Sequence, residues 1–297
     1  KGATAHASRP AGEMEQALRG VGVLHSSVDL WESITHREPR EGTCIEATRR
    51  REGSSDGWNN QLPTPQKIRE LQIKLYRKAK ADRKWKAWSL YGELCRRDIL
   101  EMALEQVMAN DGAPGIDGVD VRLFKYVPNK REKFLESLEA ELRAKQYRPS
   151  PVRRVYIKKE NGKLRPLGIP TVKDRVVQSA LVILLMPIGE ADFHPHSYAY
   201  RPKKNAQQAM EAIKVAALQG RTEVMDADLS GYFDSIPHHL LLRLVAQRVS
   251  DGSILSLVKG WLRAPVVEAT ADRRRQRVCA NRQGTPQGGV ISPWLAN

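Results

Sequence analysis

The chain has 297 residues, of which 41% are hydrophobic, enough for two modest domains or for one large mixed domain with an extension. Its 49 Lys and Arg outnumber 34 Asp and Glu, and the formal net charge of +15 favours a polyanionic partner, although a protein that is merely basic is the alternative. Three isolated cysteines argue against a disulfide framework, and no apolar run is long enough to span a bilayer.

The first third of the chain divides into two segments of different character. Residues 1–62 are rich in Gly, Ser, Arg and Glu with little apolar periodicity, and we expect a poorly ordered leader there. Residues 63–110 form a basic extension, predicted to be helical over 66–108 because apolar residues recur at three- and four-residue steps. Its cations form either a solvated helix face or a surface that follows phosphates, and the second hypothesis assigns RNA binding to Lys74, Lys78, Arg83 and Lys84.

Residues 111–297 predict a third region in which short strands mix with helices. A breaker-rich loop at 110–120 precedes an amphipathic helix over 131–146. The segment 150–159 predicts a strand that enters an Asn–Gly turn. Thr171 begins a buried helix, and a further helix runs from about Ala206 to Gln219, after Asn205 and before Gly220. The class predicted is therefore α+β or mixed α/β.

The stretch "TEVMDADLSGYFDSIPHH" (222–239) concentrates carboxylates. Residues 223–229 alternate as in a strand, which would place Asp226 and Asp228 on one face, where both could approach a cation. Ser235 is predicted to cap the following helix, and Asp234 beside it is interpreted as mainly structural. A carboxylate at a strand end lies beside the turn of Ser230, Gly231 and Tyr232, whose backbone N–H groups could bind phosphate oxygens. This pattern suggests Mg²⁺-assisted phosphoryl transfer. An acidic strand end at the protein surface, without such a function, is the alternative.

Two other segments add to this hypothesis. "KKENGKLRPLGIP" (158–170) carries cations around a tight turn, and these suit the triphosphate of a nucleotide. "RQGTPQGGVISP" (282–293) has glycines around Gln287, so its backbone could approach a substrate closely. Between them, the basic stretch 269–278 suits a nucleic-acid backbone.

In this order, the segments resemble the reverse transcriptases encoded by bacterial group II introns. The matching pieces are "GAPGIDGV", "VYIKKENGKLRPLGIPT", "HSYAYRP", "DADLSGYFDSIPHH" and "GTPQGGVISPWLAN". The resemblance implies a right-hand polymerase fold with fingers and an incomplete palm over 111–297, preceded by the helical extension. It also implies an RNA-directed DNA polymerase that uses Mg²⁺, deoxynucleoside triphosphates, and an intron RNA template with its primer, without a membrane, in the bacterial cytoplasm.

The resemblance assigns roles residue by residue. Asp228 matches the first catalytic, metal-binding aspartate, assisted by the carbonyl of Leu229. Phe233 matches the aromatic residue beneath the nucleotide sugar, and Arg201 a template-side or structural contact. Lys158 stands where a proline is usual, which leaves open whether Lys158 or Lys159 binds phosphate. The nucleotide-binding residues implied are Lys159, Arg165, Ser230, Gly231, Tyr232, Phe233 and Gln287.

The resemblance also sets an expectation about completeness. The family's Tyr-x-Asp-Asp motif and thumb would follow Asn297, so we expect this chain alone to lack polymerase activity, since a two-ion site needs further carboxylates. The alternative hypothesis is a non-catalytic, maturase-like module that binds intron RNA.

Overall fold

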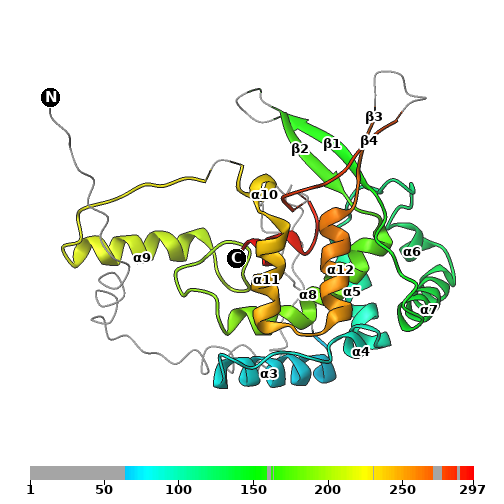
Figure 1. Ribbon diagram of the computed structural model, residues 1–297, viewed down its shortest axis with the longest axis horizontal. Coiled ribbons are helices and arrows are strands. Elements are labelled where there is room, and N and C mark those ends of the chain that lie inside the picture. Colours follow the sequence, from blue (N-terminus) through cyan, green and yellow to red (C-terminus); the bar gives the residue numbers. More distant parts are fainter. Residues whose placement is uncertain (1–63, 159–161, 163, 230, 270–275, 286–287) are drawn as a thin grey trace, which may run out of the picture. The chain divides into compact units, whose positions relative to one another are not determined.

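The described part of the chain combines helices with one small sheet. The computed structural model describes residues 64–158, 162, 164–229, 231–269, 276–285 and 288–297, and the predicted leader over 1–62 lies outside these ranges (Figure 1). The helices and strands confirm the predicted α+β class. The strands are β1 (Val152–Lys158), β2 (Leu164–Ile169), β3 (Val266–Ala269) and β4 (Gln276–Cys279). The helices are α3 (Gln66–Ala81), α4 (Tyr91–Leu94), α5 (Arg97–Ala109), α6 (Leu123–Tyr126), α7 (Lys130–Arg143), α8 (Val172–Glu190), α9 (Ala206–Leu218), α10 (Tyr232–Ser235), α11 (His238–Arg248), α12 (Gly252–Arg263) and α13 (Ser292–Ala296).

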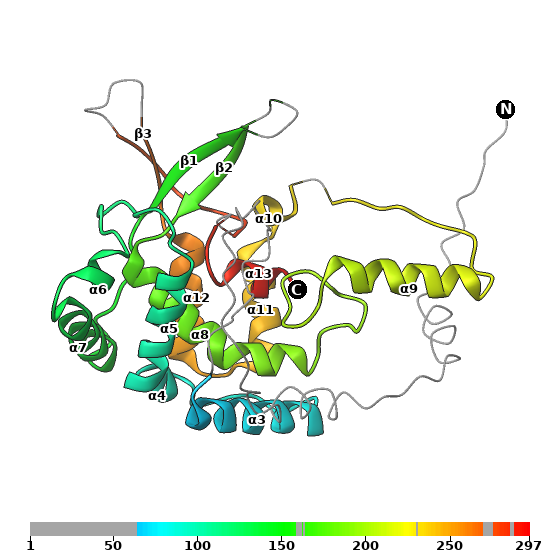
Figure 2. The same cartoon turned by 180° about the vertical axis from the view of Figure 1, so that it is seen from behind.

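The four strands form a sheet in the order β2-β1-β3-β4. β1 pairs antiparallel with β2 and parallel with β3, and β3 pairs antiparallel with β4. Both opposite views place this sheet on the side of the molecule away from α3 (Figures 1 and 2). The sequence predicted β1 but indicated only a basic stretch at 269–278, where β3 ends and β4 lies.

Helix α8 forms the centre of the core. It is buried from Val172 to Gly189 except at Lys173, and α3 and α5 pack against it. Thr171 caps it as predicted, because its side chain accepts a hydrogen bond from the backbone N–H of Asp174. None of the helices in the described ranges combines the length and the apolar composition that a membrane crossing needs.

A proline inside α8 fixes the position of α3. Pro187 has no N–H, so the carbonyl of Ile183, four residues earlier, lacks its helical partner. The side chain of Gln72 on α3 donates a hydrogen bond of 2.9 Å to that carbonyl. A buried acceptor left by the proline is thus satisfied by the neighbouring helix.

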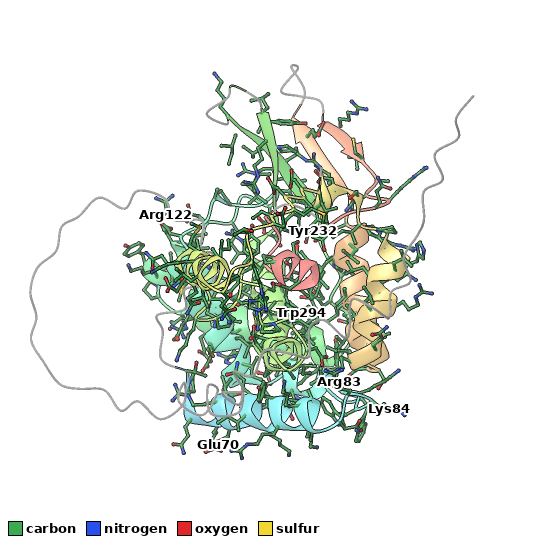
Figure 3. The ribbon with its side chains drawn as sticks, turned by 90° about the vertical axis from the view of Figure 1, so that its left-hand side faces the viewer. Glu70, Arg83, Lys84, Arg122, Tyr232 and Trp294 are labelled. Carbon is green, nitrogen blue, oxygen red and sulfur yellow. The ribbon has the colours of Figure 1, made fainter. Side chains whose placement is uncertain are left out.

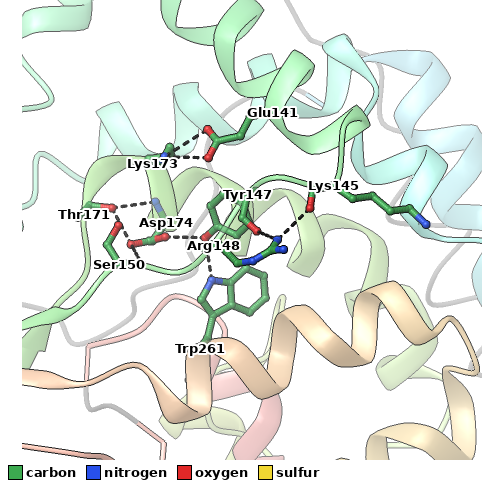
Figure 4. A network of polar contacts seen from close by, with 9 residues as sticks. All are labelled: Glu141, Lys145, Tyr147, Arg148, Ser150, Thr171, Lys173, Asp174 and Trp261. Atoms are coloured by element: carbon green, nitrogen blue, oxygen red, sulfur yellow. Dashed lines mark hydrogen bonds and ion pairs between the residues drawn. The ribbon is translucent and has the colours of Figure 1, made fainter.

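A buried polar network links α8 to α12 (Figure 4). Tyr147 donates to Asp174 Oδ1 over 2.5 Å and accepts from Trp261 Nε1 over 2.9 Å. Thr171 Oγ1 donates to Asp174 Oδ2 over 2.7 Å. Burial raises the pKa of the Asp174 carboxyl, although the bonds from Tyr147 and Thr171 act in the opposite direction. The network therefore fixes how three separate elements meet.

Asp251 joins two helix starts. Its Oδ2 accepts from the backbone N–H groups of Leu90 and Tyr91, where α4 begins. Its Oδ1 accepts from those of Ser253 and Ile254 in the first turn of α12. One buried carboxylate thus satisfies unpaired amides of both helices.

The prediction of helix over 66–108 was partly wrong. The helix breaks from residue 82 to 90, between α3 and α4. In this break Ala87 forms a parallel bridge with Val249, and the guanidinium of Arg248 donates to the carbonyls of Ala79, Asp82 and Trp85. These long-range bonds compete with helix continuation, and local periodicity does not report them.

The prediction of a strand over 223–229 was wrong. The segment has no assigned secondary structure, and it is exposed throughout, with Met225 at 91% and Leu229 at 71%. Its backbone makes no hydrogen bond to another described residue. A strand needs such a partner, and the alternating sequence alone cannot supply one.

Several local predictions are confirmed. The amphipathic helix predicted over 131–146 is α7, which buries Leu135, Leu138 and Leu142. Helix α9 begins with a complete capping box, in which Asn205 and Gln208 bond reciprocally, and it is followed by Gly220 at a φ of +82°. The signals for these helices lie within a few residues of their ends.

Candidate functional site

The C-terminal loop is bound to α10. The backbone N–H of Gly284 donates to the carbonyl of Ile236 over 2.8 Å, and that of Thr285 to Phe233 over 2.7 Å. The buried His238 donates from Nε2 to the carbonyl of Gly284 over 2.7 Å. These bonds bring Gly284 and Thr285 against the segment "YFDSIPHH", so the two stretches adjoin.

The same loop also reaches β2 and α8. Gly288 has a φ of +103°, and a Cβ there would lie 2.5 Å from the carbonyl oxygen of Gly168 in β2. The backbone N–H of Ile291 bonds to the side chain of Gln178 on α8. The loop is therefore anchored on the hairpin, on α10 and on the core helix.

A cavity of about 240 Å³ lies between the hairpin and this loop. Arg154 projects into it from β1, and its Nε is buried without a hydrogen-bond partner among the described residues. Its Nε lies 3.9 Å from Glu268 Oε1. The lining residues are Arg154, Pro166, Gly168, Asp234, Val266, Asn281, Gln283, Gly284 and Thr285. A guanidinium and a carboxylate among backbone groups suit a polar ligand.

The hairpin has three arginines, of which Arg154 lies on one face and Arg153 and Arg165 on the other. Arg154 is paired with Gly168, whereas Arg165 is paired with Ile157. Alternate residues of a strand point to opposite faces, so the exposed Arg165 lies on the face opposite the one that lines the cavity. Sequence reasoning selected Arg165 and missed Arg154, since only the strand register distinguishes them. Lys159 and Gln287 lie outside the described residues.

Tyr232 and Phe233, the aromatic pair of α10, directly precede Asp234, which lines the cavity. Gly231 begins α10 at a φ of +61°, and Ser230 before it lies outside the described residues. Tyr232 donates from its hydroxyl to the carbonyl of Ala296 over 2.8 Å. The ring of Phe233 meets that of Tyr200 edge-on at 6.4 Å between centroids. The nucleotide contacts implied for Gly231, Tyr232 and Phe233 stay predictions.

Asp228 and Leu229 lie on the exposed segment before α10. Among the described residues, no three side chains of His, Cys, Asp or Glu gather closely enough to hold a metal ion. Asp226 is likewise exposed, so the shared strand face expected for it and Asp228 is absent. The described residues therefore do not assemble a Mg²⁺ site.

Asp234 and Ser235 both belong to α10. Asp234 lines the cavity, and its interpretation as mainly structural stays a prediction. The Ser235 hydroxyl donates to the carbonyl of Tyr232, and α11 begins after Pro237 without a side-chain cap. The predicted Ser235 cap is therefore wrong, because Ser235 lies within the preceding short helix.

Arg201 is a buried residue with a complete set of protein partners. Its guanidinium bonds to both carboxylate oxygens of Glu190, and it donates to the carbonyls of His194 and Ser197. Its side chain is 5% exposed. Of the two roles implied for it, this placement favours the structural one over RNA contact.

The cations predicted to bind RNA lie along the second half of α3 and in the turn after it. Arg83 and Lys84 lie at the edge of the molecule formed by α3 (Figure 3). The side chains of Lys74, Lys78, Arg83 and Lys84 are all exposed. Their exposure leaves them accessible to a polyanion, and RNA binding by them stays a prediction.

Comparisons with known proteins agree with the resemblance seen in the sequence. The reverse transcriptase (RNA-dependent DNA polymerase) family matches residues 157–297. Protein YkfC of Escherichia coli is 37% identical over 77% of this chain and 60% of its own length. Group II intron-encoded protein LtrA of Lactococcus lactis is 34% identical over 70% of this chain and 33% of its own length.

The solved partial Cas6-RT-Cas1–Cas2 complex aligns with 71% of this chain and 33% of that chain, at 23% identity and a TM-score of 0.46.

The chain spans 60% of YkfC and 33% of LtrA, less than two thirds of either. The family match begins in β1 and contains both segments that meet at the cavity, 164–169 and 281–285. By this match residues 157–297 belong to the reverse transcriptase family, and the chain is similar to a group II intron-encoded protein and to a nuclear intron maturase of Arabidopsis thaliana.

Proposed function

We propose that this chain contributes the fingers and part of the palm of a group II intron-encoded RNA-directed DNA polymerase, which copies RNA into DNA and aids splicing and mobility of its intron. One observation carries the proposal. Three motif segments that are far apart in sequence, on β1–β2, on α10 and in the C-terminal loop, surround one polar cavity.

The ligands proposed are an intron RNA template with its primer and deoxynucleoside triphosphates. In the cavity, the Arg154 guanidinium carries a planar set of N–H donors, from which phosphate oxygens can accept hydrogen bonds. By motif, further nucleotide contacts are proposed for Lys159, Arg165, Ser230, Gly231, Tyr232, Phe233 and Gln287, of which Arg165 lies on the hairpin face opposite the cavity. Arg154 adds a phosphate contact that the motifs did not suggest.

The proposed metal ligand is Asp228, assisted by the carbonyl of Leu229. Both residues are exposed, and no cluster of three ligating side chains exists among the described residues. Mg²⁺ takes few protein carboxylates, yet a two-ion site needs more than one. We therefore propose Asp228 as one ligand of a Mg²⁺ site to which other carboxylates contribute.

The test is primer extension on an RNA template by the protein expressed from its natural reading frame. Asp228→Asn is expected to lower cDNA synthesis at least about a hundredfold, since even outer-shell partners of a metal are worth about 10–100-fold. Glu223→Gln is the matched control, because Glu223 is an exposed carboxylate on the same segment. Undiminished synthesis by the Asp228→Asn variant would reject Asp228 as the catalytic metal ligand, and absence of primer extension by the wild-type protein would reject the polymerase proposal.

The second candidate function is a maturase-like module that binds intron RNA without synthesis. The observation that favours it is the exposed row of cations on α3 and the turn after it, away from the cavity. Primer extension separates the two functions, because a polymerase extends the primer and loses this activity in Asp228→Asn, whereas a binding module extends it in neither form and keeps its RNA affinity and splicing activity in both.

A further inference from the structure

A second cavity, of about 610 Å³, shares no residue with the first. It lies between the segment leading into α4, the segment after α7, and the first turns of α12. The residues that line it are Trp88, Tyr91, Lys145, Tyr147, Arg148, Pro149, Ser250, Asp251, Gly252, Ser253, Ser256, Leu257 and Gly260.

Three aromatic side chains line this cavity, and besides the buried Tyr147 they are Tyr91 and Trp88, which have different surroundings. Tyr91 is fixed, because its hydroxyl donates to the carbonyl of Leu142 over 2.8 Å and its backbone N–H bonds to Asp251. Trp88 is 77% exposed, the largest side chain of the described part to be so open. An indole ring is seldom left in water, and its exposure at the mouth of a cavity indicates a surface on which a flat ligand can stack.

The charge of the cavity is positive. Its charged lining residues are Lys145, Arg148 and Asp251, and the Asp251 carboxylate already accepts four backbone N–H groups. Lys145 Nζ lies 5.8 Å from the centroid of the Tyr91 ring. Arg148 donates from Nη1 to the carbonyls of Lys145 and Tyr147, which holds its guanidinium at the rim while the side chain stays exposed.

The approach to the cavity is also basic. The exposed Arg83, Lys84 and Lys86 precede Trp88 along the chain. A polyanion that contacts α3 and its following turn would therefore be led along this segment towards the aromatic rings. Opposite them, the hydroxyls of Ser253 and Ser256 on α12 offer donors and acceptors to the polar edge of a ligand.

We propose that this cavity binds one or two nucleotides of single-stranded RNA, with a base stacked on Trp88 and the adjoining phosphates on Lys145 and Arg148. The pairing of an open aromatic ring with cations is the general basis of single-strand binding. An acidic peptide would use the cations but not the ring, and a proline-rich peptide would use the ring but not the cations. The site specifies where the proposed RNA binding would occur, so this inference rests on the proposed function.

The test is the affinity of the full chain for a fluorescent single-stranded oligouridylate, measured by anisotropy over a range of salt concentrations. Trp88→Ala is expected to weaken binding about tenfold, the value of one stacked base, with the salt dependence unchanged. The double variant Lys145→Ala/Arg148→Ala is expected to lower the slope of log K against log salt by about 0.7 for each lost phosphate contact. Trp88→Phe should restore part of the affinity.

The matched control is Tyr126→Ala. Tyr126 is 69% exposed and has Lys125 Nζ 5.4 Å from its ring centroid, yet it lines neither cavity. Loss of affinity in Tyr126→Ala equal to that in Trp88→Ala would overturn the site, as would an unchanged Trp88→Ala variant. A 5-bromouridine probe that cross-links to the peptide containing Trp88 would support the site, and one that cross-links only elsewhere would overturn it.

The outcomes separate the two proposals. If the wild-type chain binds the probe with a salt-dependent affinity and Trp88→Ala binds it with the same affinity, the cavity is rejected as the binding site, while RNA binding by the chain is supported. If the wild-type chain shows no salt-dependent binding, RNA binding itself fails, and the cavity with it. Binding of a proline-rich peptide that Trp88→Ala abolishes, or of an acidic peptide that Lys145→Ala/Arg148→Ala abolishes, with RNA affinity unchanged in the same variant, would replace RNA as the ligand.

Discussion

Gly284 shows how closely the pieces of the first cavity approach one another. It has a φ of +80°, a conformation that residues with a Cβ adopt at a cost. A Cβ at this position would also lie 2.7 Å from the backbone of Asp234 and from the carbonyl oxygen of Phe233. Any side chain here must therefore displace α10 from the loop.

Gly284→Ala is expected to destabilise the fold through both effects. The left-handed backbone costs about 1–2 kcal/mol, and crowding against α10 adds about 1–3 kcal/mol. Gly118→Ala is the control, because Gly118 has a φ of +69° but a Cβ added there would meet no atom within 4 Å. Urea unfolding of both variants isolates the crowding contribution, and equal losses would contradict a close approach of loop and helix.

At the scale of elements, Asp251 shows that a single side chain can support two helices. Its carboxylate accepts from the first amides of α4 and of α12, which are separated by some 160 residues of sequence. A cap of this kind connects the stability of the basic extension to that of the region after α11.

Asp251→Ala is expected to cost about 1–4 kcal/mol of unfolding free energy, because each helix cap is worth about 0.5–2 kcal/mol. Asp117→Ala serves as the control, since Asp117 is exposed and accepts from one backbone N–H, that of Val119. Chemical denaturation followed by circular dichroism measures the difference. A loss no greater than that of Asp117→Ala would show that water replaces both caps.

Elements whose signals are local were predictable from the sequence. Thr171 and Asn205 cap α8 and α9 through side chains three residues from their partners, and α7 shows its buried stripe directly in its spacing. The motif segments likewise indicated the hairpin, α10 and the C-terminal loop as parts of one site. Each of these inferences needed only neighbouring residues.

Features that depend on distant partners were not predictable. The break at 82–90 follows from bonds to Arg248, and the segment 223–229 alternates like a strand without a strand to pair with. The choice of Arg154 over Arg165 as the cavity residue follows from the β1–β2 register. In each case the deciding contact joins residues that no short stretch of sequence contains.

At the scale of the whole molecule, the net charge of +15 attracts polyanions, and the place where they bind depends on where the cations are exposed. Some cations are neutralised locally, as Arg122 is by Asp120 over 2.5 Å. The exposed Lys74, Lys78, Arg83 and Lys84 lie along α3 and the turn after it, so we expect RNA to meet the molecule there.

Alanine at each of Lys74, Lys78, Arg83 and Lys84 is expected to lower the salt slope of single-stranded RNA binding by about 0.7. The control is Arg122→Ala, which makes the same change in net charge but removes a cation that is already paired. Figure 3 shows Arg122 away from α3, Arg83 and Lys84. Affinities measured at several salt concentrations provide the comparison. If Arg122→Ala lowers the slope as much as the α3 variants do, the binding surface lies elsewhere or the attraction depends on net charge alone.

The bond from Gln72 to Ile183 has an evolutionary consequence. Pro187 leaves the Ile183 carbonyl without a helical hydrogen-bond donor, and the Gln72 side chain on α3 donates to it instead. Substitution at Gln72 is therefore more restricted than substitution at Pro187. A lineage that loses the proline first regains a helical N–H for that carbonyl and then tolerates many residues at 72. A lineage that loses the glutamine first passes through an ancestor with an orphaned buried acceptor. Descendants of this chain should therefore retain Gln72 for as long as they retain Pro187.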